Sequence, residues 1–184
     1  MDHLADSQRV LTIGEGDGRF VAELVRRFPQ IEVDCLEGSA AMIARARARL
    51  PPAAKVNFYH VDALNWEYPV EIYDAVVTCF FLDCFNDRTL RKWMAKAVSC
   101  TKPSGKWLVA EFREGAGGME RLNSRFWLRV MYRFFGWTTG LEAKQLPDWE
   151  GLLGELDYSC FDRAETVNSM LHWSVWQRGK LLAK

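Results

Sequence analysis

Several features that would assign this chain to a particular class of protein are missing. Lys and Arg together number 24, and so do Asp and Glu, so no net charge favours binding to nucleic acid. Apolar runs such as residues 75–82 are far shorter than the ~20 residues that cross a bilayer. The first residues are polar and acidic, without the apolar core of a signal peptide. These absences predict a cytoplasmic protein with no nucleic-acid partner.

Cysteine and histidine are also scarce and scattered. The five cysteines include no CxxC pair, and only three histidines accompany them. No group has the spacing of metal ligands, so no metal site is expected. Several cysteines lie in apolar runs, where a free thiol behaves as a small hydrophobic group. Reduced thiols of this kind agree with a cytoplasmic location.

What the sequence does contain is a regular alternation of strand-like and helix-like segments. The strand-like segments are residues 9–13, 31–37, 55–63, 73–82 and 105–112. Helix-like periodicity occupies residues 20–28, 40–50 and 88–101 between them. This alternation predicts parallel βαβ units.

The rhythm changes after residue 112. Residues 113–147 form an insertion, and a short helix is expected over residues 148–156. Two last strand-like segments, 158–167 and 170–178, are close enough in sequence to pair as an antiparallel hairpin. With no repeat and no clear linker, the prediction is one α/β domain over residues 1–184.

A glycine-rich loop follows the first strand. Gly14, Gly16 and Gly18 occupy every second position before a helix begins. Glycine is needed where φ is positive or where a ligand presses on the backbone. A dinucleotide-binding GxGxxG motif would require Gly or Ala where Arg19 stands, which argues against an NAD(P)-dependent oxidoreductase. The loop suits a nucleoside with a short charged tail.

This loop resembles the glycine-rich first motif of class I S-adenosylmethionine-dependent methyltransferases. The resemblance implies that Gly14, Gly16 and Gly18 contact the cofactor. The family usually has an acid two positions before the first glycine, and this chain has Thr12 there. Glu15, inside the loop, is a candidate to replace that acid at the methionine end of the cofactor.

Two more features match the family in the expected order. Glu37 closes the second strand 23 positions after Gly14, near the offset of about 20 for an acid that binds ribose hydroxyls. By resemblance, Gly38 and Met42 follow it at the adenine, with the methionine packed on the ring face. The pair Asp62 and Ala63, after the third strand, is expected to recognise the adenine amine and ring nitrogen.

The end of the fourth strand is expected to face the reacting sulfur. By resemblance, backbone carbonyls near Cys79 and Phe80 hold the methionine amino group, and Asp83 is the candidate for contacting the acceptor or taking its proton. The resemblance covers about residues 9–112. It implies a three-layer α/β/α Rossmann-like fold with a mostly parallel seven-stranded sheet.

Each of these residues also has a purely structural interpretation. The glycines could form only a tight strand–helix turn, and Glu37 could be a solvated turn residue. Asp62 could be a turn former and Met42 a core residue. Asp83 could cap the helix that follows. These alternatives remain open in the sequence.

The insertion contains an aromatic-rich segment, residues 119–137. Four arginines recur every four residues along it, at Arg121, Arg125, Arg129 and Arg133. Three roles compete for this segment: a core helix, a lid over a hydrophobic or aromatic acceptor, or contact with a membrane surface or partner subunit.

The sequence thus predicts methyl transfer from S-adenosylmethionine to a small, hydrophobic or aromatic acceptor, with S-adenosylhomocysteine as the product. The main alternative is a non-catalytic protein of the same fold that binds the cofactor or acts as a scaffold, because Thr12 departs from the family pattern. An NAD(P)-dependent oxidoreductase is the least favoured. Monomer and homodimer are both compatible with the sequence.

Overall fold

The computed structural model describes residues 1–112, 147–165 and 171–179. The predicted insertion therefore lies outside the described residues, apart from Pro147. So does the 119–137 segment, with its proposed lid or membrane contact. No helix in the described ranges is long and apolar enough to cross a membrane.

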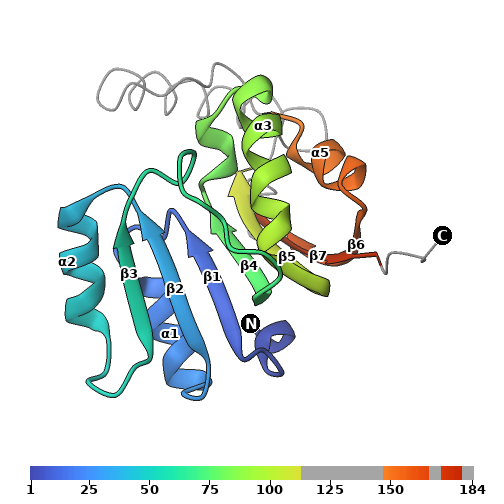
Figure 1. Ribbon diagram of the computed structural model, residues 1–184. Helices are drawn as coiled ribbons and strands as arrows, with labels where there is room; N and C mark the ends of the chain where they lie inside the picture. Colours follow the sequence, from blue (N-terminus) through green and yellow to red (C-terminus); the bar gives the residue numbers. More distant parts are fainter. Residues whose placement is uncertain (113–146, 166–170, 180–184) are drawn as a thin grey trace.

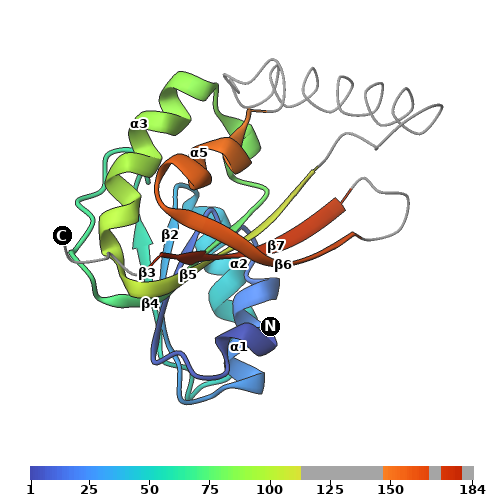
Figure 2. The same cartoon turned by 90° about the vertical axis from the view of Figure 1, so that its right-hand side faces the viewer.

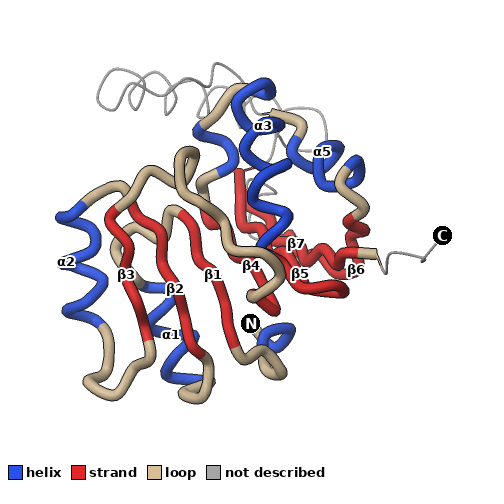
Figure 3. The backbone as a smooth tube through the Cα atoms, viewed as in Figure 1, coloured by secondary structure: helices blue, strands red, loops and turns tan. Residues whose placement is uncertain are grey.

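Seven strands form one sheet in the order β3-β2-β1-β4-β5-β7-β6 (Figure 3). Neighbours among the first five strands run parallel, whereas β7 runs antiparallel to both β5 and β6. This arrangement confirms the predicted parallel sheet with a C-terminal antiparallel hairpin. The strands are β1 Arg9–Ile13, β2 Glu32–Glu37, β3 Val56–His60, β4 Tyr73–Cys79, β5 Thr101–Phe112, β6 Tyr158–Glu165 and β7 Leu171–Arg178.

Helices cover both faces of the sheet (Figures 1 and 2). α1 (Arg19–Arg27) and α2 (Ala40–Arg49) lie on one face, and α3 (Asp87–Ala97) and α5 (Trp149–Glu155) lie on the other. Each face has its own apolar core, one built around α1 and one around α3 and α5. The structure is therefore the predicted three-layer α/β/α sandwich.

Three strand boundaries differ from the sequence prediction by three or more residues, and one of them is the end of β3, which lies at His60 instead of residue 63. β4 ends at Cys79, three residues early, and a short 3₁₀ helix, Leu82–Cys84, begins at the last residue that was expected to belong to the strand. β5 begins at Thr101, four residues early, because the turn expected at residues 102–105 is part of the strand and forms an irregularity in its pairing with β4. Ser104 takes a positive φ of 63° within that irregularity.

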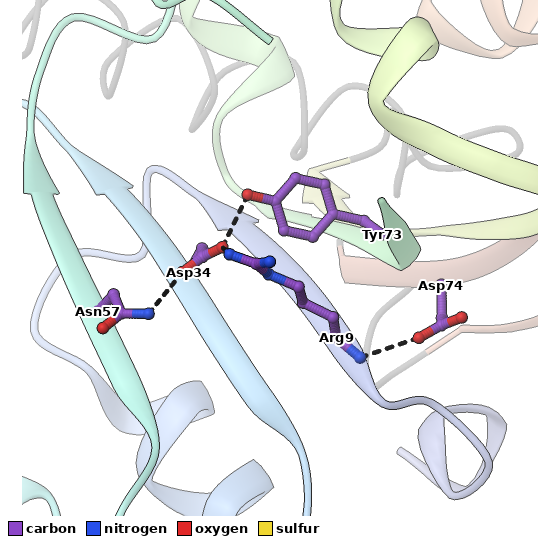
Figure 4. A network of polar contacts seen from close by, with 5 residues as sticks. All are labelled: Arg9, Asp34, Asn57, Tyr73 and Asp74. Carbon is purple, nitrogen blue, oxygen red and sulfur yellow. Dashed lines mark hydrogen bonds and ion pairs between the residues drawn. The ribbon is translucent and has the colours of Figure 1, made fainter. Parts of the chain in front are cut away.

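A buried polar network joins four strands at the amino edge of the sheet (Figure 4). Asp34 of β2 is 1% exposed, and its Oδ2 accepts hydrogen bonds from Arg9 Nη2 at 2.8 Å and Tyr73 Oη at 2.8 Å. Its Oδ1 accepts one from Asn57 Nδ2 at 2.9 Å. Asp74 accepts the backbone N–H of Arg9 at 2.9 Å. This network fixes β1, β2, β3 and β4 together at the end opposite the predicted site.

Candidate cofactor site

The carboxyl ends of β1, β2 and β4 meet at one edge of the sheet, and the glycine loop lies there. Gly14, Gly16 and Gly18 all have positive φ, at 69°, 67° and 82°. A Cβ on Gly14 would lie 2.5 Å from Cδ2 of Phe81, and one on Gly18 would lie 2.5 Å from Cα of Ala46. At Gly16 a Cβ would meet nothing within 4 Å. Close packing therefore requires two of the glycines, and the third lines open space where a ligand can approach.

Glu37 is the last residue of β2, and its side chain reaches the glycine loop. Its Oε2 accepts the N–H of Gly16 at 2.9 Å, and its Oε1 accepts the N–H of Ser39 at 2.8 Å. An ionised carboxylate offers about four acceptor positions, so two remain for other donors. The structure thus brings Glu37 to the glycine loop in a fixed orientation, with capacity left for a pair of hydroxyls.

Glu15 is directed at α1. Its Oε1 accepts the N–H of Val21 at 3.1 Å, and so caps a helix whose N-cap residue, Gly18, has no side chain. Burial raises the pKa of Glu15 to about 7; hydrogen bonds from two α1 amides oppose the increase, while the charges of Asp17 and Glu37 add to it. This carboxyl therefore titrates near neutral pH. A cation bound beside it would favour the ionised form.

Thr12 cannot perform the role of the usual acid. It is 1% exposed inside β1 and pairs in register with Cys35 of β2. Its side chain is buried and carries no charge.

Asp62 lies in the turn after β3, beside the end of β2. Its Oδ1 accepts the N–H of Leu64 at 2.9 Å, and its Oδ2 accepts a hydrogen bond from Asn65 Nδ2 at 2.7 Å. These contacts are those of a turn former, yet the side chain is exposed and each oxygen retains an acceptor position. The neighbouring Ala63 is buried, and its carbonyl accepts from the Tyr68 hydroxyl at 2.8 Å.

The start of α2 follows Glu37 directly. Gly38 is exposed, and its carbonyl contacts His60 Nε2 at 3.0 Å. The N–H of Met42 donates to Oγ of Ser39, the N-cap residue, at 3.4 Å. Met42 itself is half-buried. Gly38, Met42 and Asp62 therefore gather at the ends of the adjacent strands β2 and β3, where the sequence predicted the adenine.

The chain is strained at the end of β4. Cys79 is half-buried, and Phe80 follows with a φ of 54° while leaving 45% of its surface exposed. Its N–H donates to the carbonyl of Ala110 in β5 at 2.8 Å. Non-glycine residues with positive φ are uncommon and concentrate at functional sites.

Asp83 lies in the 3₁₀ helix after β4 and is 4% exposed. The suggestion that it caps α3 is wrong, because Asn86 is the N-cap and its side chain accepts the N–H of Thr89 at 2.9 Å. The acid belongs instead to a buried cluster under the end of β4.

The other member of that cluster, Glu111, was not predicted from the sequence. It is fully buried near the end of β5, and its Oε1 accepts the backbone N–H of Phe81 at 2.9 Å and of Leu82 at 2.8 Å. In the sequence, Glu111 is an acid in an otherwise apolar strand segment. A strand residue that faces solvent gives the same pattern. Burial is decided by the β4 turn and β7, which are distant in sequence.

An apolar cavity of about 230 Å³ lies elsewhere, on the α1 face of the sheet. Phe20, Leu108 and Trp173 line it, and Cys79 is the single residue that it shares with the predicted site. This cavity does not mark the cofactor edge.

The residues at the carboxyl edge fit S-adenosylmethionine. Two acids, Glu15 in the glycine loop and Glu37 beside it, complement a ligand that carries a sulfonium and an ammonium group. The charge of Asp17, by contrast, is compensated by Arg19 and Arg49. Glu37 retains acceptors for ribose hydroxyls, and space is open above Gly16. Within the described ranges no three His, Cys, Asp or Glu residues are placed to hold a metal ion.

Comparison with known proteins gives a consistent result. A family model described as a methyltransferase domain matches residues 10–105, more than half of the chain. The demethylmenaquinone methyltransferase of Deinococcus radiodurans is 31% identical over 113 residues, which are 61% of this chain and 46% of that protein. The match therefore spans about half of that relative.

Solved structures share the fold at low identity. N-methyltransferase NodS from Bradyrhizobium japonicum WM9, in complex with S-adenosylhomocysteine, has a TM-score of 0.67 at 16% identity, covering 94% of this chain and 78% of NodS. An O-methyltransferase family 2 protein from Planctomyces limnophilus, in complex with apigenin, has a TM-score of 0.75 at 13% identity, with 93% and 51% covered. Together with the family match, the glycine loop and the strand order, these findings place the chain in the class I S-adenosylmethionine-dependent methyltransferase family.

Proposed function

We propose that this chain binds S-adenosylmethionine at the carboxyl edge of β1, β2 and β4 and transfers its methyl group to a small apolar or aromatic acceptor. The observation that carries the proposal is the Glu37 carboxylate, which the N–H groups of Gly16 and Ser39 hold across the glycine loop at 2.9 and 2.8 Å. A preorientated carboxylate beside open space is what two neighbouring ribose hydroxyls require.

Other residues would hold the rest of the cofactor. Asp62 and Met42 would contact the adenine, and the backbone carbonyls of Cys79 and Phe80 would accept hydrogen bonds from the ammonium group. Glu15 would add negative charge near the positively charged end of the ligand. When bound, the cofactor supplies a methyl group already activated by its sulfonium.

The protein's own task is to hold the acceptor in line with that methyl group, at about 3–3.5 Å. The aromatic pair Phe80 and Phe81 after β4 supports an acceptor with a flat apolar face. The named relative is a demethylmenaquinone methyltransferase, and one structural neighbour was crystallised with apigenin; both compounds contain a flat ring system. These similarities suggest quinol-like and phenolic acceptors as the first to test.

One observation favours the second candidate, a protein that binds the cofactor without catalysis. Thr12 is buried where the family carries an acid, and Glu15 directs its carboxyl to α1. The methionine end of the cofactor would then be held less firmly than in an active enzyme.

Isothermal titration with S-adenosylhomocysteine, using NADH as the comparison ligand, tests the cofactor. Micromolar binding of the first and none of the second is the expected result. Labelled methyl transfer to a panel of quinols, phenols and amines then tests activity. Binding without transfer to any acceptor would favour the non-catalytic candidate, and absence of binding would refute both.

A further inference from the structure

Glu111 is a buried carboxyl that the proposed function leaves without a role. It comes from β5 and has no exposed surface. One of its oxygens, Oε1, accepts two backbone N–H groups, those of Phe81 and Leu82. A side chain that holds two consecutive amides fixes the backbone between them, and here that backbone is the turn after β4.

This turn forms part of the wall of the cofactor edge. The ring of Phe81 lies so close to Gly14 that a Cβ there would come within 2.5 Å of it. Phe80 just before it has a φ of 54° and is held by its N–H to the carbonyl of Ala110 at 2.8 Å. β5 therefore accepts hydrogen bonds from the turn in two ways, through the backbone carbonyl of Ala110 and through the side chain of Glu111.

A second acid, Asp83, lies near Glu111. Oε2 of Glu111 is buried and has no hydrogen-bond partner in the described part of the chain, and the Asp83 carboxyl is near enough for its charge to act on Glu111. Burial first, and then the charge of Asp83, raise the pKa of Glu111 well above its ordinary value, against the two amides that lower it.

Other titratable groups adjoin the pair. The thiols of Cys79 and Cys84 lie on the β4 side, and burial raises the pKa of each to about 12, so both are neutral at physiological pH. On β7, His172 pairs in register with Glu111, is 3% exposed and stacks on Trp149 of α5 at 5.3 Å. Cross-strand neighbours in an antiparallel pair share one face of the sheet, so His172 lies beside Glu111 on the α5 side.

We propose that Glu111 is a positioning residue of the cofactor site: through the amides of Phe81 and Leu82 it holds the turn after β4 against the glycine loop. This inference rests on the proposed function, since it assigns the turn to the binding of S-adenosylmethionine. Loss of the proton that burial favours on Glu111 places a negative charge beneath the turn, where it is poorly solvated, and loosens the turn. Cofactor affinity therefore falls reversibly at alkaline pH.

The test is titration with S-adenosylhomocysteine across a pH series from mildly acidic to alkaline, so that no acceptor is needed. Glu111→Gln keeps an oxygen for the amides and an NH₂ group for Asp83, but it cannot lose a proton. We expect it to bind like the wild type near neutral pH and to retain its affinity at alkaline pH, where the wild type weakens. Glu15 titrates in both proteins, so its effect cancels in the ratio of their affinities.

Glu111→Ala leaves both amides without their acceptor and should bind about tenfold more weakly throughout the series. Glu32→Gln, an exposed acid on β2 at the opposite edge, is the matched control and should follow the wild type. If Glu111→Ala does not fold, the pH profile of Glu111→Gln still decides the matter, because a purely structural role would leave that profile unchanged.

Wild-type-like binding by Glu111→Ala, or an alkaline decline in Glu111→Gln equal to that of the wild type, would overturn the role of Glu111 while leaving the proposed function intact. Failure of the wild type itself to bind S-adenosylhomocysteine would overturn both.

Discussion

Asp34 at the amino edge of the sheet and Glu111 at the carboxyl edge are both buried carboxyls, with 1% and 0% of their surface exposed. Asp34 accepts hydrogen bonds from the guanidinium of Arg9 and from two neutral side chains, so its charge is compensated (Figure 4). Glu111 meets two backbone amides and a second acid. The acid at the amino edge is therefore paired with a cation, whereas burial disfavours the charge of Glu111 at the edge where a ligand is expected.

The titration behaviour of the two edges follows from this difference. The hydrogen bond to Asp34 raises the pKa of Arg9, which strengthens an ion pair already present. At the other edge, burial raises the pKa of both Glu15 and Glu111, so each carboxyl is destabilised in its charged form. Groups of this kind, in a strand-edge site, are typical of functional positions.

The largest effect is expected from Asp34→Ala. The substitution leaves the partly buried Arg9 without its anion and removes the acceptor for Tyr73 and Asn57, so unfolding free energy should fall by about 3–5 kcal/mol in urea titrations. The affinity of the folded protein for S-adenosylhomocysteine should remain within about twofold of wild type, since the network lies at the opposite edge. Glu32→Ala, exposed on the same strand, should change stability by less than about 0.5 kcal/mol. A loss below that level for Asp34→Ala would remove the distinction between the edges.

The next effect depends on pH. Folding raises the pKa of Glu15 from 4.5 to about 7, so the folded protein holds a proton that the unfolded chain has released between these values. The stability linked to this proton is fully present below pH 4.5 and is lost as the pH rises through about 7. The Glu15→Gln variant has no group that titrates at this position. Its free energy of unfolding, relative to that of the wild type, should therefore increase by up to about 3 kcal/mol as the pH rises between these values. Parallel stability curves for the two proteins would show that Glu15 is not destabilised by burial.

The smallest effect concerns binding. Glu37→Ala removes a charge-assisted hydrogen-bond pair to the ribose and should weaken S-adenosylhomocysteine binding by about 1.5–3 kcal/mol, roughly tenfold to a hundredfold. Isothermal titration measures this directly, with Glu32→Ala as the control. Glu37→Ala also leaves the amides of Gly16 and Ser39 without their acceptor. Glu37→Gln keeps an oxygen for one of these amides, so comparing the two variants separates support of the loop from binding of the ribose. Unchanged affinity in both variants would exclude Glu37 from the site.

Local patterns account for what could be predicted. β-branched runs ending in glycine located β1 and its loop, and the alternation of elements implied the parallel sheet and terminal hairpin that the structure confirms. The need for positive φ at Gly14, Gly16 and Gly18 was also a local property, and all three have it. Predicted contacts of these residues with the cofactor remain predictions.

The boundaries that were misplaced depend on pairing between strands. Residues 80–82 look like a continuation of β4, but Phe80 turns because its amide reaches the carbonyl of Ala110 and Glu111 holds the next two amides. Residues 102–105 look like a turn, but Thr101 and Lys106 on either side of them both pair with β4, so β5 runs through these residues. Neither partner is close in sequence, so neither pattern contained the information.

The sequence by itself determined the order of the elements, the glycine loop and the acids that follow the strands, because spacing, propensity and turn chemistry act over a few residues. Only the tertiary structure decided which acids are buried and what they meet. Asp34 gains Arg9, Asn57 and Tyr73 from three other strands, whereas Glu111 meets Asp83 beneath a strained turn. A carboxyl is the same chemical group at either edge. The groups that long-range packing places around it decide whether its charge is stabilised or destabilised.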